Sequence, residues 1–117
     1  MEAGPIIERI CRLPADFYRG SKSMVQLVSE SGIREFPSAL AVDGIAAYIA
    51  EHPDLVEQWL RWSENKRVLS GWYFARRPGG FVVGLFPEGE KIEISKPEFA
   101  CAEFIKREVH AMATRSR

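Results

Sequence analysis

Residues 68–95, VLSGWYFARRPGGFVVGLFPEGEKIEIS, decide the fold that this chain is expected to adopt. They contain three short runs rich in aromatic and β-branched residues, at 68–77, 81–86 and 91–95, separated by turns that contain proline and glycine. Such runs are typical of β-strands, and short connections favour antiparallel pairing of neighbours. The stretch therefore predicts a three-stranded antiparallel meander.

The turns between these runs set the expected register. The first turn closes as a two-residue or a four-residue loop of one and the same register, in which Arg77 pairs with Gly80. In the second turn, residues 87–89, Pro-Glu-Gly, fit a type I turn followed by a glycine in the left-handed conformation. That turn would pair Phe86 with Glu90.

Because side chains alternate along a strand, this register assigns each residue of the meander to one of two faces. The first face is apolar with small residues in its middle: Tyr73, Ala75, Val82, Gly84, Phe86, Ile92 and Ile94. The second carries large apolar residues and charges at its rim: Trp72, Phe74, Arg76, Phe81, Val83, Leu85, Lys91 and Glu93. We expect the C-terminal helix to approach the first face closely. The second face is expected to lie under earlier helices, or in part against a partner protein.

Helical periodicity precedes and follows the meander. Four helices are expected before it: 5–12, a segment that starts at Ser21 or Ser23 and ends at Gly32, a short one from Asp43 to about His52, and one that starts at Pro53. The last has the clearest amphipathic stripe, formed by Leu55, Val56, Trp59 and Leu60.

After the meander, residues 95–98, Ser-Lys-Pro-Glu, fit a capping box, and an apolar stripe runs from Phe99 to Met112. The expected fold class is therefore α+β, with N-terminal helices, the meander and a C-terminal helix packed on the sheet. Residues 1–117 are expected to form one domain.

The composition disfavours several functions. Lys plus Arg and Asp plus Glu both total 16, so the net charge is zero, which disfavours a dedicated nucleic-acid-binding protein. The N-terminal apolar runs are short and are broken by Glu8 and Arg9, so they indicate neither a signal peptide nor a membrane span. A cytoplasmic location is the default expectation.

The sequence contains no recognisable catalytic pattern. Cys11 and Cys101 lie in apolar settings typical of buried free thiols. Cys101 and His110 are nine positions apart on the predicted helix, so they point to opposite sides of it. A zinc site would have to gather these residues and His52 from separate places. We expect a non-enzymatic protein with no metal and no cofactor.

Aromatic and basic residues around the junction between the predicted helix and the first strand are the candidates for binding. Tryptophan and arginine contribute most to protein interfaces, although cations at a helix C-terminus also stabilise the helix itself. We expect a partner protein to be contacted by Trp62, Asn65, Lys66, Arg67, Trp72 and Arg76.

The segments WSENKRVLSGWYF (62–74), FVVGLF (81–86) and PEFACAEFIKREV (97–109) follow one another in an order that resembles small bacterial domains of the toxin-immunity type. The resemblance spans residues 54–109. It implies a cytoplasmic, non-enzymatic protein that binds and neutralises a toxin domain, and it assigns no role to any residue.

Two other functions are compatible with the same sequence. One is a nucleic-acid accessory domain that uses an aromatic sheet face with basic edges. The other is a small ligand-binding or enzymatic domain whose site involves His52 or grouped carboxylates.

Overall fold

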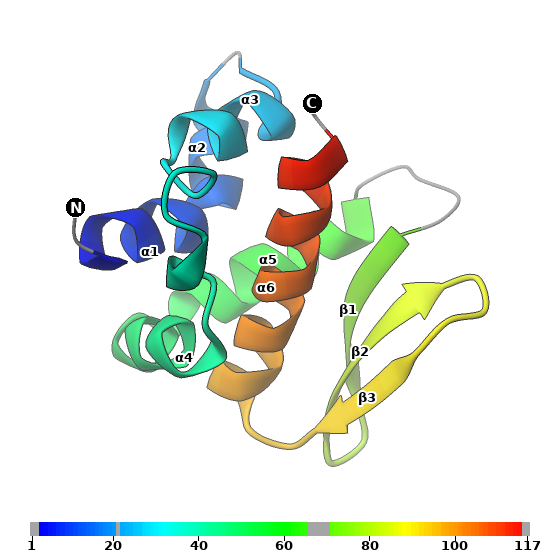
Figure 1. The fold of residues 1–117 in the computed structure, drawn as a ribbon. Coiled ribbons are helices and arrows are strands. Elements are labelled where there is room, and N and C mark those ends of the chain that lie inside the picture. The colour runs from blue at the N-terminus through cyan, green and yellow to red at the C-terminus, as the bar shows by residue number, and fades with distance from the viewer. Residues whose placement is uncertain (1–2, 21, 66–70, 116–117) are drawn as a thin grey trace.

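The computed structural model describes residues 3–20, 22–65 and 71–115. Helices precede the sheet: α1 (Ala3–Cys11), α2 (Leu13–Arg19), α3 (Met24–Glu30), the 3-10 helix η1 (Pro37–Ala39), α4 (Val42–Glu51) and α5 (Asp54–Asn65). The meander and the C-terminal helix follow as β1 (Gly71–Arg77), β2 (Gly80–Phe86), β3 (Lys91–Ile94) and α6 (Pro97–Arg115) (Figure 1). The α+β class and the antiparallel meander are confirmed. Predicted strand residues 68–70 lie outside the described ranges.

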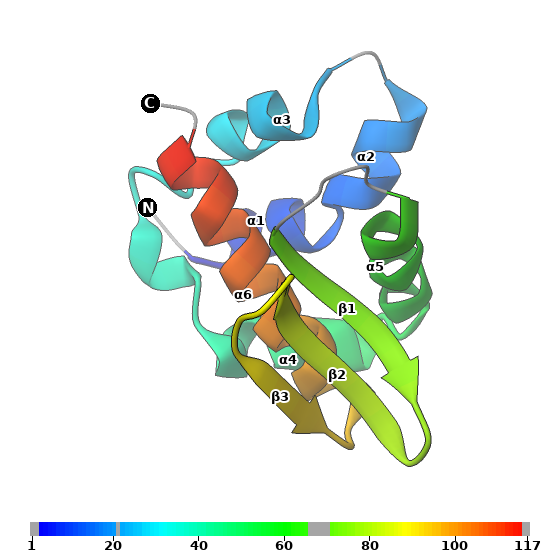
Figure 2. The ribbon, with the colours of Figure 1, turned by 90° about the vertical axis from the view of Figure 1, so that its right-hand side faces the viewer.

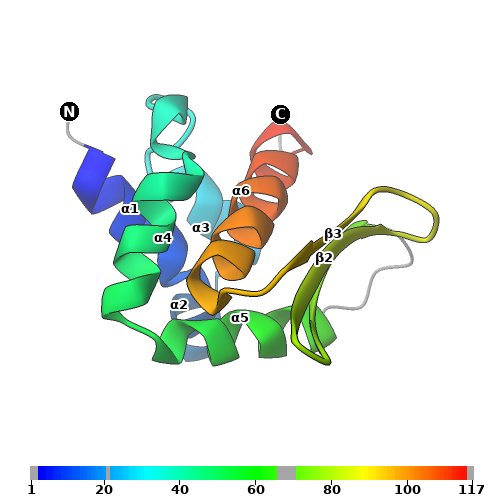
Figure 3. The ribbon, with the colours of Figure 1, turned by 90° about the horizontal axis from the view of Figure 1, so that it is seen from below.

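Helix α6 separates the N-terminal helices from the sheet. In Figure 1 it runs between α1–α4 on one side and the strands on the other, and α5 passes behind it to reach β1. Figures 2 and 3 show that α5 and α6 both lie on the same side of the sheet, and that no described helix lies over its other side. The sheet is therefore covered on one face by the described residues.

The core is continuous from the N-terminal helices to the sheet. Phe104 of α6 is fully buried and contacts Trp59 of α5 edge-on, with ring centroids 5.8 Å apart. The same ring stacks on Phe74 of β1 at 5.6 Å. The indole Nε1–H of Trp59 donates to the Cys11 carbonyl at 2.9 Å, which satisfies a polar group that burial would otherwise leave unpaired.

The helix starts agree with the expected ones in part. Of the two candidate serines, Ser23 caps α3, since its hydroxyl accepts from the Gln26 N–H. Helix α4 begins at Val42, one residue before the predicted capping residue Asp43, and the Asp43 carboxylate lies in its first turn. Helix α2 is not among the helices that the sequence predicts. Proline is tolerated in a first turn, where its missing N–H has no helical partner.

The register between β1 and β2 is the predicted one. Arg77 pairs with Gly80 and Trp72 pairs with Leu85. The connecting loop is therefore the two-residue Pro78–Gly79, and Gly79 has φ 82°, the left-handed conformation that the second position of a type II turn requires.

The register between β2 and β3 differs by one residue from the predicted one. Leu85 N–H donates to the Glu90 carbonyl at 2.9 Å, so Leu85, and not Phe86, pairs with Glu90. Further along, Val83 pairs with Ile92 and Phe81 with Ile94. A one-residue shift moves every side chain of β3 to the opposite face, so both isoleucines join the helix-covered face and the charged residues of β3 leave it.

The predicted placement of the C-terminal helix was also wrong. Helix α6 packs on the inner face of the sheet, which we define as Trp72, Phe74, Phe81, Val83, Ile92 and Ile94. The outer face carries Tyr73, Ala75, Arg77, Val82, Gly84, Lys91 and Glu93. Burial of the larger apolar surface decides which face is covered.

No described helix packs against the small residues of the outer face. A Cβ added at Gly84 would lie 2.6 Å from the Tyr73 Oη, because the Tyr73 ring lies over its own cross-strand partner. The space above the glycine is thus filled from within the sheet. The sandwich with helices on both faces, expected from the sequence, does not form among the described residues.

The β2–β3 register can be tested with a matched pair of substitutions. Ile94→Ala should lower the free energy of unfolding by about 1–2 kcal/mol, because Ile94 packs against the core. Glu93→Ala should change it by less than about 0.5 kcal/mol, because Glu93 is exposed. Urea unfolding in dilute solution measures both. The reverse order of effects would favour the register that pairs Phe86 with Glu90.

Candidate binding surface

Trp62 of α5 lies half-buried inside the helical layer. Its ring meets Phe17 of α2 edge-on at 5.2 Å, and its Nε1–H donates to Glu108 Oε2 on α6 at 3.2 Å. Glu108 itself is 5% exposed. These contacts join three helices, so the geometry gives Trp62 a packing role within the described chain.

Trp72 of β1 lies half-buried on the inner face, under α6. The Arg107 guanidinium sits over its ring at 5.3 Å and also forms an ion pair with Glu90 at 3.6 Å and one with Glu103. Trp72 is therefore held by cation–π contact between the sheet and α6.

Arg76 reaches the surface near the β1–β2 turn. Its side chain is 58% exposed, lies over the Phe81 ring at 5.6 Å and forms an ion pair with Glu57 of α5. The hydrogen bond with Glu57 raises the pKa of Arg76 above its ordinary value. Asn65 is exposed at the last position of α5, whereas Lys66 and Arg67 lie outside the described residues.

The candidates that the structure describes therefore do not gather in one exposed cluster. The two tryptophans face different layers, and Arg76 stands apart from both at the opposite end of β1 from Trp72. Arg76 does, however, border a groove that is not predicted from the sequence.

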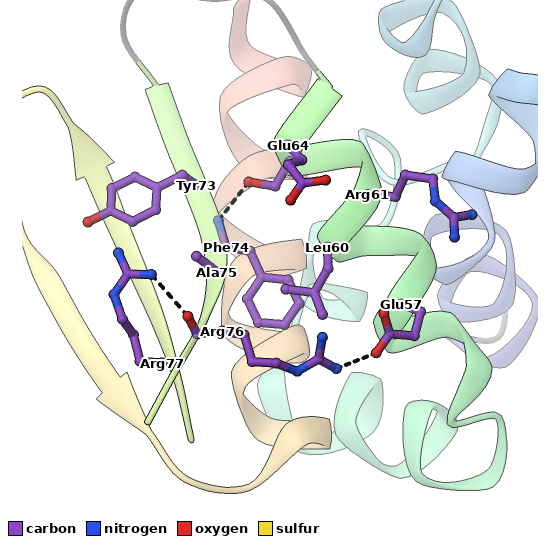
Figure 4. A pocket seen from close by; sticks show the side chains of 10 residues that line it. Glu57, Leu60, Arg61, Glu64, Tyr73, Phe74, Ala75, Arg76 and Arg77 are labelled. Carbon is purple, nitrogen blue, oxygen red and sulfur yellow. Dashed lines mark hydrogen bonds and ion pairs between the residues drawn. The ribbon is translucent and has the colours of Figure 1, made fainter. Parts of the chain in front are cut away.

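This groove lies between α5 and β1 and has a volume of about 540 Å³ (Figure 4). Leu60 and Phe74 lie at its centre. Two contacts join its walls: the Arg76–Glu57 ion pair, and a hydrogen bond of 2.8 Å from the Phe74 N–H to the Ser63 Oγ. The second contact satisfies a backbone group that β1 directs away from β2.

Charged residues line the groove, although the side chains of Arg61 and Arg77 point away from its centre in Figure 4. The lining includes three arginines and two glutamates, namely Arg61, Arg76, Arg77, Glu57 and Glu64. Since the side chains of Glu57 and Arg76 neutralise each other, Arg61, Arg77 and Glu64 remain without an ion pair to another described residue. The local balance is therefore one positive charge.

Sequence reasoning missed the α5 side of this groove, although a signal was present. Glu57, Arg61 and Glu64 recur at positions i, i+4 and i+7, which places them on one polar stripe of the helix. What the sequence did not show is that β1 runs beside this stripe.

The two thiols are poorly suited to nucleophilic chemistry. Cys11 and Cys101 are free and buried, as predicted. Burial raises the pKa of the Cys11 thiol to about 12 and that of Cys101 well above its ordinary value. Both remain protonated at neutral pH, and the thiolate is the reactive form.

The described ranges contain neither a metal-binding cluster nor a membrane-spanning helix. No group of three or more His, Cys, Asp and Glu side chains among these residues is placed to hold a metal ion. Within the same ranges, every helix is too short or too polar to cross a membrane.

Comparison with known proteins gives no relative: no protein-family model matches the chain, and neither a curated protein nor a solved structure is significantly similar to it.

The buried thiols predict how stability depends on pH. The folded-state pKa of Cys11 is about 12, whereas an unfolded thiol titrates near 8.5, so the folded chain holds the proton more tightly. The stabilisation is complete below the unfolded pKa and is lost as pH rises towards the folded one. Through Cys11, the free energy of unfolding should fall by about 2 kcal/mol between pH 8 and pH 10.

Chemical unfolding at several pH values, with wild type and Cys11→Ala compared, measures this contribution. The variant should lose less stability than the wild type over that range. Identical pH profiles would show that Cys11 is not buried as described.

Proposed function

We propose that this chain is a non-enzymatic protein-binding domain and that its partner contacts the groove between α5 and β1. The supporting observation is the combination, in one groove, of a half-buried apolar side chain, Leu60, above the buried Phe74 ring, with charged lining residues of which three are arginines. Protein interfaces commonly place an apolar or aromatic anchor at the centre and charged groups at the rim, and arginine is enriched in them.

The rim charges indicate what kind of partner surface fits. Arg61 and Arg77 have no ion-pair partner among the described residues, and Arg76 forms an exposed ion pair with Glu57 in addition to its contact with the Phe81 ring. A partner carboxylate can pair with the first two arginines, or replace Glu57 on Arg76, at little cost, since exposed ion pairs are weak. An acidic surface with one protruding apolar side chain is therefore the complementary shape.

The resemblance to immunity proteins supports a toxin domain as this partner. Such a protein would act in the cytoplasm by covering the toxin surface. The small size of the chain and its zero net charge are compatible with that role.

The nucleic-acid alternative receives no support from the fold. It requires bases to stack on the aromatic residues of the sheet, but Phe74 and Phe81 are 2% and 8% exposed on the inner face under α6. The other alternative, a small ligand-binding or enzymatic domain, is expected to use His52 or grouped carboxylates. The groove is lined by two carboxylates, Glu57 and Glu64, but His52 is not among its lining residues.

Affinity capture from the native cell, followed by calorimetry with the purified captured protein, tests the proposal. Arg77→Glu and Arg76→Ala should each weaken binding by about tenfold or more, which corresponds to about 1.4 kcal/mol. Both side chains are exposed, so thermal stability should hardly change.

Lys106→Glu provides the matched control, because Lys106 is exposed on α6 and does not line the groove. It should bind as the wild type does. Capture of no specific protein, or equal binding by the groove variants and the control, would contradict the proposed interface.

A further inference from the structure

The two edges of the sheet are protected differently. At the β1 edge, α5 runs alongside, and Ser63 accepts the hydrogen bond of an edge N–H. At the β3 edge, no described helix or strand lies alongside the strand in Figures 1 and 2. An open edge presents unpaired backbone donors and acceptors to another strand.

The register identifies which backbone groups are available. Ladder hydrogen bonds alternate along an antiparallel pair, and Leu85 N–H donates to the Glu90 carbonyl. Ile92 and Ile94 therefore direct their backbone groups to β2, opposite Val83 and Phe81. The N–H and C=O groups of Lys91 and Glu93 point away from the sheet, at the open edge.

The side chains at this edge are complementary to a copy of themselves. Lys91 and Glu93 stand on either side of Ile92, are exposed on the outer face and form no ion pair with another described residue. If a second β3 is laid antiparallel and centred on Ile92, Lys91 of each chain meets Glu93 of the other. The same arrangement brings the outward backbone groups of these two residues opposite each other, so charge and hydrogen bonding select one register.

Apolar surface lies on the inner side of the same edge. Ile92 is only half-buried, and Phe99 of α6 is 37% exposed. Phe99, Glu103 and Arg107 are spaced four residues apart, so they form one stripe of α6, and Arg107 forms an ion pair with Glu90, the residue before β3. Helix α6 also contacts β3, so a second copy that pairs with β3 would lie close to this stripe.

We propose that β3 is a homodimer interface at which a second copy of the chain pairs antiparallel, centred on Ile92, and joins the two three-stranded sheets into one. A lysine on an edge strand normally discourages pairing. In the register centred on Ile92, Lys91 of one chain is opposite Glu93 of the other, so its charge is paired. A shift of the second strand by two residues would remove these opposite-charge pairs. The inference does not depend on the groove between α5 and β1.

The strand has four residues, so the interface is small and the dimer weak. We expect a dissociation constant on the order of 10–100 µM. Sedimentation equilibrium over about 1–500 µM should therefore show a concentration-dependent shift from monomer to dimer.

Charge reversal tests the register. Lys91→Glu and Glu93→Lys should each raise the dissociation constant by about tenfold or more, since each places like charges opposite each other at both ends of the pairing. The double variant Lys91→Glu/Glu93→Lys restores opposite pairs and should return the dissociation constant to within about threefold of wild type. Glu88→Lys, an exposed change in the turn before β3, should leave it unaltered.

Both charged side chains are exposed, so circular dichroism should show that every variant is folded. A wild-type chain that stays monomeric over the whole range would overturn the proposal. So would a dimer that the single reversals leave intact, or one that the double variant fails to restore.

Discussion

The ring of Phe104 is the contact on which the rest of the structure depends. It is fully buried between the Trp59 ring of α5 and the Phe74 ring of β1, and Trp59 in turn donates a hydrogen bond to the Cys11 carbonyl of α1. Elements far apart in the sequence are joined through this one side chain. Because each aromatic pair contributes about 0.5–1.5 kcal/mol beyond its buried area, the helices and the sheet stabilise each other.

This junction also decides which surfaces stay free. Since α5 and α6 both lie on the inner side of the sheet, no described helix covers the outer face or the β3 edge. A groove separates α5 from β1 over part of their length, and its walls are joined by the Arg76–Glu57 ion pair and by the hydrogen bond to Ser63. Both proposed interfaces, the groove between α5 and β1 and the open edge of β3, therefore result from the packing of α5 and α6 on one side of the sheet. They lie at opposite edges of the sheet.

Local patterns predicted the elements but not how they meet. The Pro78–Gly79 turn was enough to set the β1–β2 register, because a two-residue loop leaves little choice. In β3, apolar and charged residues alternate, and this pattern fits the sheet whichever face the isoleucines occupy. The face is set by the length of the turn around residues 87–89, and a change of one residue in that turn moves the isoleucines to the other face. Short-range patterns do not determine this length. The face covered by α6 is fixed by the distant Phe104. For the candidate site, residue type alone could not separate interface from core: Trp62 and Trp72 are held by Glu108 and Arg107 of α6, 46 and 35 positions along the chain.

Native-state hydrogen exchange in the wild type and in Phe104→Leu tests the central claim most directly. If Phe104 joins the helices and the sheet into one cooperative unit, the most protected amides of β2 and of α5 should lose the same protection, about 1–2 kcal/mol. A loss confined to the strands, with α5 unchanged, would show that the sheet opens on its own and would contradict this account.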